Sequence, residues 1–249
     1  MSPPLTVRGE GPPVVLIHPL GADRSFWRLL QIDGHTLLTY DLPGHGENGA
    51  AVPDRATLLA ADLNALLSAN GWAMVHLVGA SLGGLVAQAF TAAYPDQVRS
   101  LSLVDTVAVY PEPMREMWRS RAALARQQGL SPLAEPTMQT WFSPAAPAEL
   151  VEAERARFLV SDQEGYAATC DLLCDADESG QRISAPTLVV CGRSDGPAFV
   201  AAAEAFAVDI PGSRLLWLEN SRHAGVLEEP ELFDQALTTF LQDVEGVPR

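Results

Sequence analysis

Short apolar segments, each bounded by Gly, Pro or Asp, recur along the chain and predict buried strands. They occupy residues 13–18, 36–41, 75–80, 100–105, 187–192 and 214–219. The apolar residues in them are consecutive rather than alternating, which is typical of strands covered on both faces of a parallel sheet. Helical periodicity occupies residues 54–70, 82–94 and 230–242. Strands that alternate with helices of this length predict an α/β fold with a doubly wound, mostly parallel sheet.

One long interval, residues 107–185, breaks this alternation. It holds no convincing strand, and its Glu-, Ala- and Arg-rich helical stretches are separated by proline-containing connectors. We interpret the interval as a helical cap inserted over the carboxyl-terminal edge of the sheet. The predicted organisation is a core of residues 1–106 and 186–249, with a cap of residues 107–185.

The composition of the chain limits the kinds of binding partner that we expect. The 249 residues are 47% hydrophobic, which suits a large α/β domain with a substantial core. The net charge of −15 comes from acidic residues spread along the chain, so we expect no nucleic-acid partner and no docking on an anionic membrane. No segment approaches the roughly 20 apolar residues that span a bilayer.

The cysteines and the first residues of the chain indicate the cellular compartment that we expect for the protein. The start of the chain lacks the basic and apolar pattern of a signal peptide. The three cysteines, an odd number without CxxC spacing, are Cys170, Cys174 and Cys191. We expect reduced thiols in a cytoplasmic protein and no metal site. The oligomeric state is not predicted.

The stretch Gly79-Ala80-Ser81-Leu82-Gly83 lies directly between a predicted strand and a predicted helix. A G-x-S-x-G in this context is the pattern of a nucleophile elbow, in which small residues let the chain turn sharply and expose the serine. The serine then faces the crevice at the carboxyl ends of the strands, where open α/β sheets bind ligands. We predict that Ser81 is a catalytic nucleophile.

A serine hydroxyl needs a base, and the chain has five histidines. His223 lies in the loop between the last predicted strand and the final helix, so it faces the same crevice as Ser81. His45 lies in a glycine-bounded loop and is interpreted as a loop hydrogen-bonder. His35 precedes a predicted strand and His76 begins one, so we expect structural roles for both.

The histidine in turn needs a carboxylate that fixes its tautomer. Asp195 follows the strand at 187–192 in a Gly- and Pro-containing turn. The chain order Ser81, Asp195, His223 is the order typical of hydrolases whose serine lies in a nucleophile elbow. Asp105 ends the strand at 100–105 and is the alternative acid. We favour Asp195.

A tetrahedral intermediate also needs hydrogen-bond donors for its oxygen. The amide of Leu82 follows the nucleophile at the start of a helix. The second donor is expected from the loop after the strand at 13–18, where Pro19 has no N–H and Leu20 is next. We predict an oxyanion hole from the Leu20 and Leu82 amides and, since the residues suffice for the chemistry, no cofactor.

Together these motifs resemble those of the α/β-hydrolase superfamily over essentially the whole chain. The matching segments are "HPLG" at 18–21, "DLPGHG" at 41–46, "GASLGG" at 79–84, "GRSD" at 192–195 and "RHAGVLEEP" at 222–230. Within the superfamily the segments "TWFSP" at 140–144 and "EGYAATCDLL" at 164–173 look most like the cap of the 3-oxoadipate enol-lactonase group. The resemblance implies hydrolysis of a small lactone or ester under a helical cap.

The cap residues suggest a substrate. Trp141 and Phe142 are predicted to line a short acyl site, whereas Trp118 and Tyr166 are interpreted as packing residues. Thr140 stands beside Trp141, where that group tends to carry an arginine, so we expect a small, mostly neutral lactone or ester. Two alternatives remain: a C–C bond hydrolase or lyase with the same triad, and a non-catalytic ligand receptor.

Overall fold

The computed structural model describes residues 3–246 and is built on a seven-stranded sheet with the order β1-β3-β2-β4-β5-β6-β7. The strands are Leu5–Arg8, Pro13–Ile17, Thr36–Tyr40, Val75–Ala80, Val98–Val104, Thr187–Gly192 and Arg214–Leu218, numbered β1 to β7. Among the described strands only β1, at the edge of the sheet, runs antiparallel to its neighbour β3, and the other pairs are parallel. The predicted α/β fold is confirmed, with β1 as the one strand that the apolar runs did not indicate.

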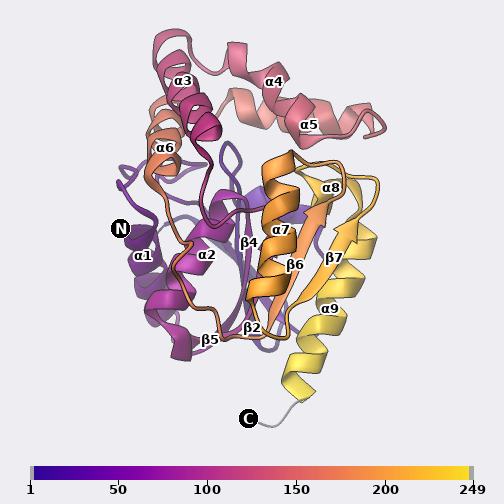
Figure 1. Ribbon diagram of the computed structural model, residues 1–249. Helices are drawn as coiled ribbons and strands as arrows, with labels where there is room; N and C mark the ends of the chain where they lie inside the picture. Colours follow the sequence, from indigo (N-terminus) through magenta and orange to yellow (C-terminus); the bar gives the residue numbers. More distant parts are fainter. Residues whose placement is uncertain (1–2, 247–249) are drawn as a thin grey trace.

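Helices cover both faces of the sheet. The helices α1 (Ala56–Ala69), α2 (Leu82–Ala93) and α7 (Pro197–Asp209) lie on one face, and α9 (Pro230–Gly246) lies on the other (Figure 1). The short 3₁₀ helix η1 (Arg24–Leu29) shares the second face, where Trp27 packs on Phe233 with ring centroids 6.2 Å apart. A shorter 3₁₀ turn, η2 (Pro95–Gln97), and a single helical turn, α8 (Gly225–Glu228), complete the core. The continuous apolar strands are therefore buried on both sides.

The interval between β5 and β6 forms four helices. They are α3 (Glu112–Gln128), α4 (Ser131–Trp141), α5 (Ala148–Leu159) and α6 (Gln163–Asp175). Figure 1 shows them together above the carboxyl ends of the strands, in the magenta-to-orange part of the chain. At the base of this insertion a β-bridge joins Val109 to Asp177, and the Glu178 amide donates to the Ala108 carbonyl at 2.8 Å.

The insertion touches the core through backbone as well as side chains. A Cβ placed on Gly165, near the start of α6, would lie 2.0 Å from the carbonyl oxygen of Gly44 in the loop after β3. Such an approach is open only to glycine. Within residues 3–246, no helix combines the length and apolar character needed to cross a membrane.

Candidate active site

Ser81 occupies the sharp turn between β4 and α2. Its backbone is in an unusual conformation, φ 51° and ψ −111°, which costs free energy in a non-glycine residue and is held by its surroundings. The Ser81 amide donates to the Val104 carbonyl at 2.9 Å, and its own carbonyl accepts from the Thr106 hydroxyl at 2.7 Å. Bonds to the neighbouring strand therefore fix the position of the hydroxyl.

The two outer glycines of the motif are required by close backbone contacts. A Cβ on Gly79 would lie 2.2 Å from the carbonyl oxygen of Gly83, and a Cβ on Gly83 would lie 2.2 Å from that of Ile17. Neither position has space for a side chain. The spacing G-x-S-x-G thus follows from the way β4 turns back against α2 and β2.

His223 and Asp195 meet beside this turn. His223 Nδ1 donates to Asp195 Oδ2 at 2.8 Å, and both side chains are buried. The Gly196 amide donates to the other carboxylate oxygen at 2.6 Å, so the post-strand turn orients Asp195. Burial acts to lower the pKa of His223, but the Asp195 carboxylate outweighs it and the pKa is raised. His223 is thereby held with its other ring nitrogen available as a base.

Asp105, the alternative acid, is engaged elsewhere. It ends β5 with a positive φ of 45°, and its Oδ1 accepts from the Gly192 amide at 2.8 Å. Burial and the charge of Asp195 raise the pKa of Asp105 well above its usual range. A carboxyl that braces the next strand through the Gly192 amide suits a positioning role rather than that of the acid partner of His223.

The predicted oxyanion donors come from adjacent strands. β2 and β4 pair in parallel at the point where the strand order reverses, and Leu20 and Ser81 follow their carboxyl ends. Within residues 3–246, neither the Leu20 amide nor the Leu82 amide donates to a protein acceptor. Both are free to bind a substrate oxygen.

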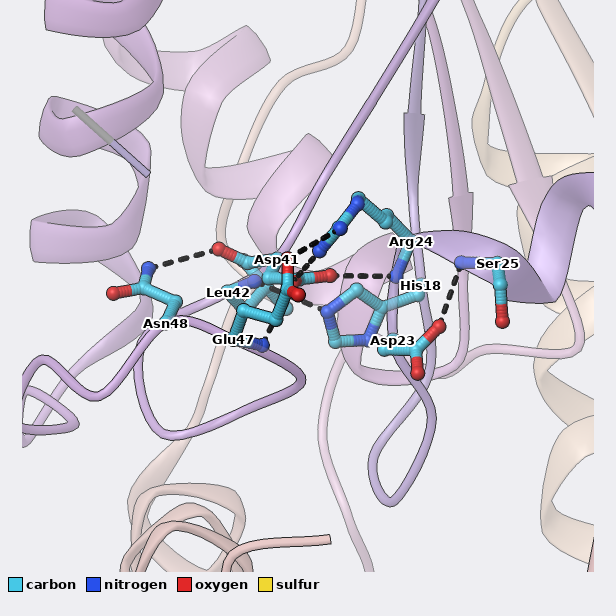
Figure 2. A network of polar contacts seen from close by, with 8 residues as sticks. All are labelled: His18, Asp23, Arg24, Ser25, Asp41, Leu42, Glu47 and Asn48. Carbon is cyan, nitrogen blue, oxygen red and sulfur yellow. Dashed lines mark hydrogen bonds and ion pairs between the residues drawn. The ribbon is translucent and has the colours of Figure 1, made fainter. Parts of the chain in front are cut away.

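A polar network supports the loop that carries Leu20 (Figure 2). His18 Nε2 accepts from the Leu42 amide at 3.1 Å, so its Nδ1 carries the proton and donates to the Pro19 carbonyl at 2.8 Å. Burial lowers the pKa of His18 to about 4, which keeps the ring neutral. His18 therefore braces the loop.

The second half of the network fixes the loop after β3. Asp41 is fully buried, and it accepts from the Arg24 guanidinium and from the Arg24 amide, the latter at 2.8 Å. The Glu47 amide donates to the same carboxylate at 2.9 Å, and Asn48 donates to the Asp41 carbonyl at 2.9 Å. These hydrogen bonds thus join the loop after β2 to the loop after β3 (Figure 2).

A cavity of about 400 Å³ lies between the core and the helical insertion. Ser81, Leu20 and His223 line it from the core, and Trp141 lines it from the cap. Phe142 lies outside the lining, because it follows the last residue of α4 in extended backbone, φ −118° and ψ 142°. Its ring packs at the edge of Trp141, with centroids 6.3 Å apart.

The cap adds polar and aromatic groups that the sequence patterns did not single out. Trp118 and Tyr166, interpreted from the sequence as packing residues, both line the cavity, as do Thr137 and Arg121. Arg121 Nε donates to the Tyr166 hydroxyl at 2.8 Å, and its terminal nitrogen donates to the Thr137 hydroxyl. The cavity wall thus includes one cap arginine, Arg121, although the position beside Trp141 carries Thr140.

The charge of Arg121 is not compensated by a nearby acid. Its guanidinium lies over the rings of Trp118 and Tyr166, 5.9 and 5.8 Å from their centroids, and within residues 3–246 it forms no salt bridge. Arg119, Arg126 and Arg155 of the insertion each pair with an exposed glutamate. A half-buried cation in a cavity wall, without an acidic partner among the described residues, can bind an anion.

Comparison with known proteins identifies the class. Residues 12–230 match the family model of the alpha/beta hydrolase fold, and the chain belongs to this family. It is 32% identical to 3-oxoadipate enol-lactonase 2 of Acinetobacter baylyi, over 94% of this chain and 90% of that protein.

Solved structures agree with this assignment. A thermophilic esterase from Thermogutta terrifontis, with malate bound, superposes with a TM-score of 0.91 at 29% identity, over 97% of this chain and 93% of the other. The enol-lactonase from Burkholderia xenovorans superposes with a TM-score of 0.86 at 28% identity, over 96% and 95%. The chain is similar to both enol-lactonases and esterases.

Proposed function

We propose that this protein is a serine hydrolase that cleaves a small lactone or short carboxylic ester through an acyl-enzyme. The observation that carries the proposal is one cavity that receives both the strained Ser81 and His223, whose Nδ1 is bonded to Asp195 at 2.8 Å. In this mechanism Ser81 attacks the carbonyl carbon while His223 Nε2 takes its proton. The Leu20 and Leu82 amides bind the oxyanion.

The second half of the reaction reuses the same groups. His223 returns the proton to the leaving oxygen, which gives an alcohol, an enol or, in a lactone, the freed end of the acyl chain. A water molecule then attacks the acyl carbon with His223 as base, and Ser81 is regenerated. The proposal needs no cofactor.

The substrate is proposed to carry an acidic group. Arg121 faces the same cavity as Ser81 without a protein counter-ion, and a buried substrate carboxylate requires such a cation. The name of the Acinetobacter relative, an enol-lactonase for 3-oxoadipate, is that of an enzyme acting on an acid, which fits this recognition. The Thr140 hydroxyl also lines the cavity and can bind a neutral oxygen.

The experiment that tests the reaction class is mass spectrometry of the protein during turnover of a nitrophenyl ester and of a carboxylate-bearing lactone. We expect an acyl adduct on Ser81 and its absence in Ser81→Ala. Turnover without any adduct would favour the C–C hydrolase or lyase mechanism. Tight binding without turnover would identify a receptor.

A further inference from the structure

A second cluster of titratable side chains lies at the amino-terminal ends of the central strands, whereas Ser81 lies at their carboxyl-terminal ends. His35 precedes β3, His76 is the second residue of β4, and Glu245 is in the last turn of α9. One ligand atom from each of the three lies within 4.8 Å of the others. Both imidazoles are buried, and the Glu245 side chain is a quarter exposed.

The hydrogen bonds of His35 fix its tautomer. His35 Nδ1 lies 3.1 Å from the Asp33 carbonyl, and because a carbonyl can only accept, this nitrogen carries the proton. Its Nε2 lies 3.3 Å from Glu245 Oε1 and has no hydrogen-bond partner among the described residues. A buried ring nitrogen that faces a carboxylate oxygen in this way is placed to share a metal ion with it.

His76 also directs its Nε2 atom toward Glu245 Oε1. Its Nε2 also lies 3.3 Å from Glu245 Oε1, and its Nδ1 is 2.7 Å from the Ser100 hydroxyl. A second hydrogen bond on the outer ring nitrogen is the usual support of a metal-binding histidine.

The two 3.3 Å contacts with Glu245 Oε1 suit a shared metal ion. Tetrahedral zinc with bonds of about 2.0–2.1 Å separates neighbouring ligand atoms by about 3.3–3.4 Å. Two imidazoles and one carboxylate are ligands that zinc accepts, with water in the fourth position.

We propose that His35, His76 and Glu245 bind one zinc ion that ties the end of α9 to the amino-terminal edge of the sheet. The carbonyl end of a helix favours a cation, which supports the position at the last turn of α9. Arg99 on β5 adds positive charge near His76 and weakens this preference. The ion lies at the opposite ends of the strands from Ser81, so its role is structural.

The sequence analysis predicted no metal site because the ligands show no local spacing. His35 and His76 reach across the intervening strand β2, and His76 and Glu245 are 169 residues apart. Only the packing of α9 on the sheet brings them together.

The test uses the untagged full chain, stripped with a chelator and titrated with zinc chloride. We expect one bound zinc per chain and, at zinc about a hundredfold above its dissociation constant, a rise in Tm of about 5–10 °C. Turnover of a nitrophenyl ester should be the same with and without zinc. Glu245→Gln should weaken zinc binding at least tenfold and remove the Tm rise, because the amide oxygen is a poorer ligand.

Matched controls separate this site from others. Glu231→Gln changes an exposed acid in the first turn of the same helix and should retain zinc, as should His223→Gln in the catalytic cavity. His76→Gln should lose zinc, and if this buried variant fails to fold, Glu245→Gln still decides. Absence of zinc from the wild type, or equal binding by wild type and Glu245→Gln, would overturn the proposal.

Discussion

Asp105 and Asp195 approach one histidine from neighbouring strands, yet only Asp195 is bonded to it. His223 Nδ1 lies 2.8 Å from Asp195 Oδ2, whereas Asp105 accepts from the Gly192 amide on β6. The two carboxyls therefore differ in hydrogen-bond partner and in the role we propose for each. This difference is open to direct measurement.

Replacing each acid by its amide should separate them. Asp195→Asn removes the acceptor that fixes the His223 tautomer, and we expect kcat/KM to fall by about 10⁴. Asp105 accepts from the Gly192 amide rather than from His223, so Asp105→Asn should lower kcat/KM by about threefold or less, with the main effect on Tm. The reverse order in steady-state kinetics would transfer the acid role to β5.

The nucleophile has its own test. Ser81→Ala should lower kcat by about 10⁴-fold or more, because the acyl-enzyme can no longer form. Its Tm should stay close to that of the wild type, since the turn is held by backbone groups of Ser81, through the bond from its amide to Val104 and the bond from Thr106 to its carbonyl. A serine-directed phosphonate should label Ser81 in the wild type. Labelling of another serine, or near-normal turnover by the variant, would move the nucleophile elsewhere.

The pH profile follows from the raised pKa of His223. The base must be neutral to take the Ser81 proton, so kcat/KM should fall as pH drops through a pKa above the usual 6.5 of histidine. Asp195→Asn removes the charge that raises this pKa, and the acid limb of its weaker activity should move to lower pH. An unmoved limb would mean that another group controls it.

Arg121 sets the expected preference for charge. Arg121→Gln should lower kcat/KM for a carboxylate-bearing lactone by about 10–100-fold, because it leaves the substrate charge unpaired. An uncharged lactone of equal ring size should lose little. Arg126→Gln, in the same helix but paired with Glu164 on the surface, is the matched control. Equal losses for both substrates would show that Arg121 supports the cap rather than the ligand.

The strands and the proposed triad could be predicted because their signals are local. Continuous apolar runs identify buried strands, and the elbow depends on residues 79–83 alone. Helix α7 was not predicted, since its alanine-rich sequence buries only Phe199, Ala203 and Phe206 and shows no strong apolar stripe. Its place between β6 and β7 completes the pattern of alternation.

The cavity wall was harder to predict because it depends on the packing of helices. Trp141 and Phe142 are adjacent in sequence, but the end of α4 falls between them and turns the second ring away. Arg121 is one of several similar arginines, and its inward position arises only from bonds to Tyr166 and Thr137 on two other helices. No local pattern distinguishes it from Arg119 or Arg126.

The two ends of the insertion between β5 and β6 are held together at its base, and this lets the segment between them vary. The Val109–Asp177 bridge and the bond from Glu178 to Ala108 hold the two ends of the segment together beside paired strands. A segment with tethered ends can change in length or sequence at little entropic cost to the rest of the chain. The part proposed to bind the substrate can thus change in sequence or length, while the residues proposed to break the bond stay in place.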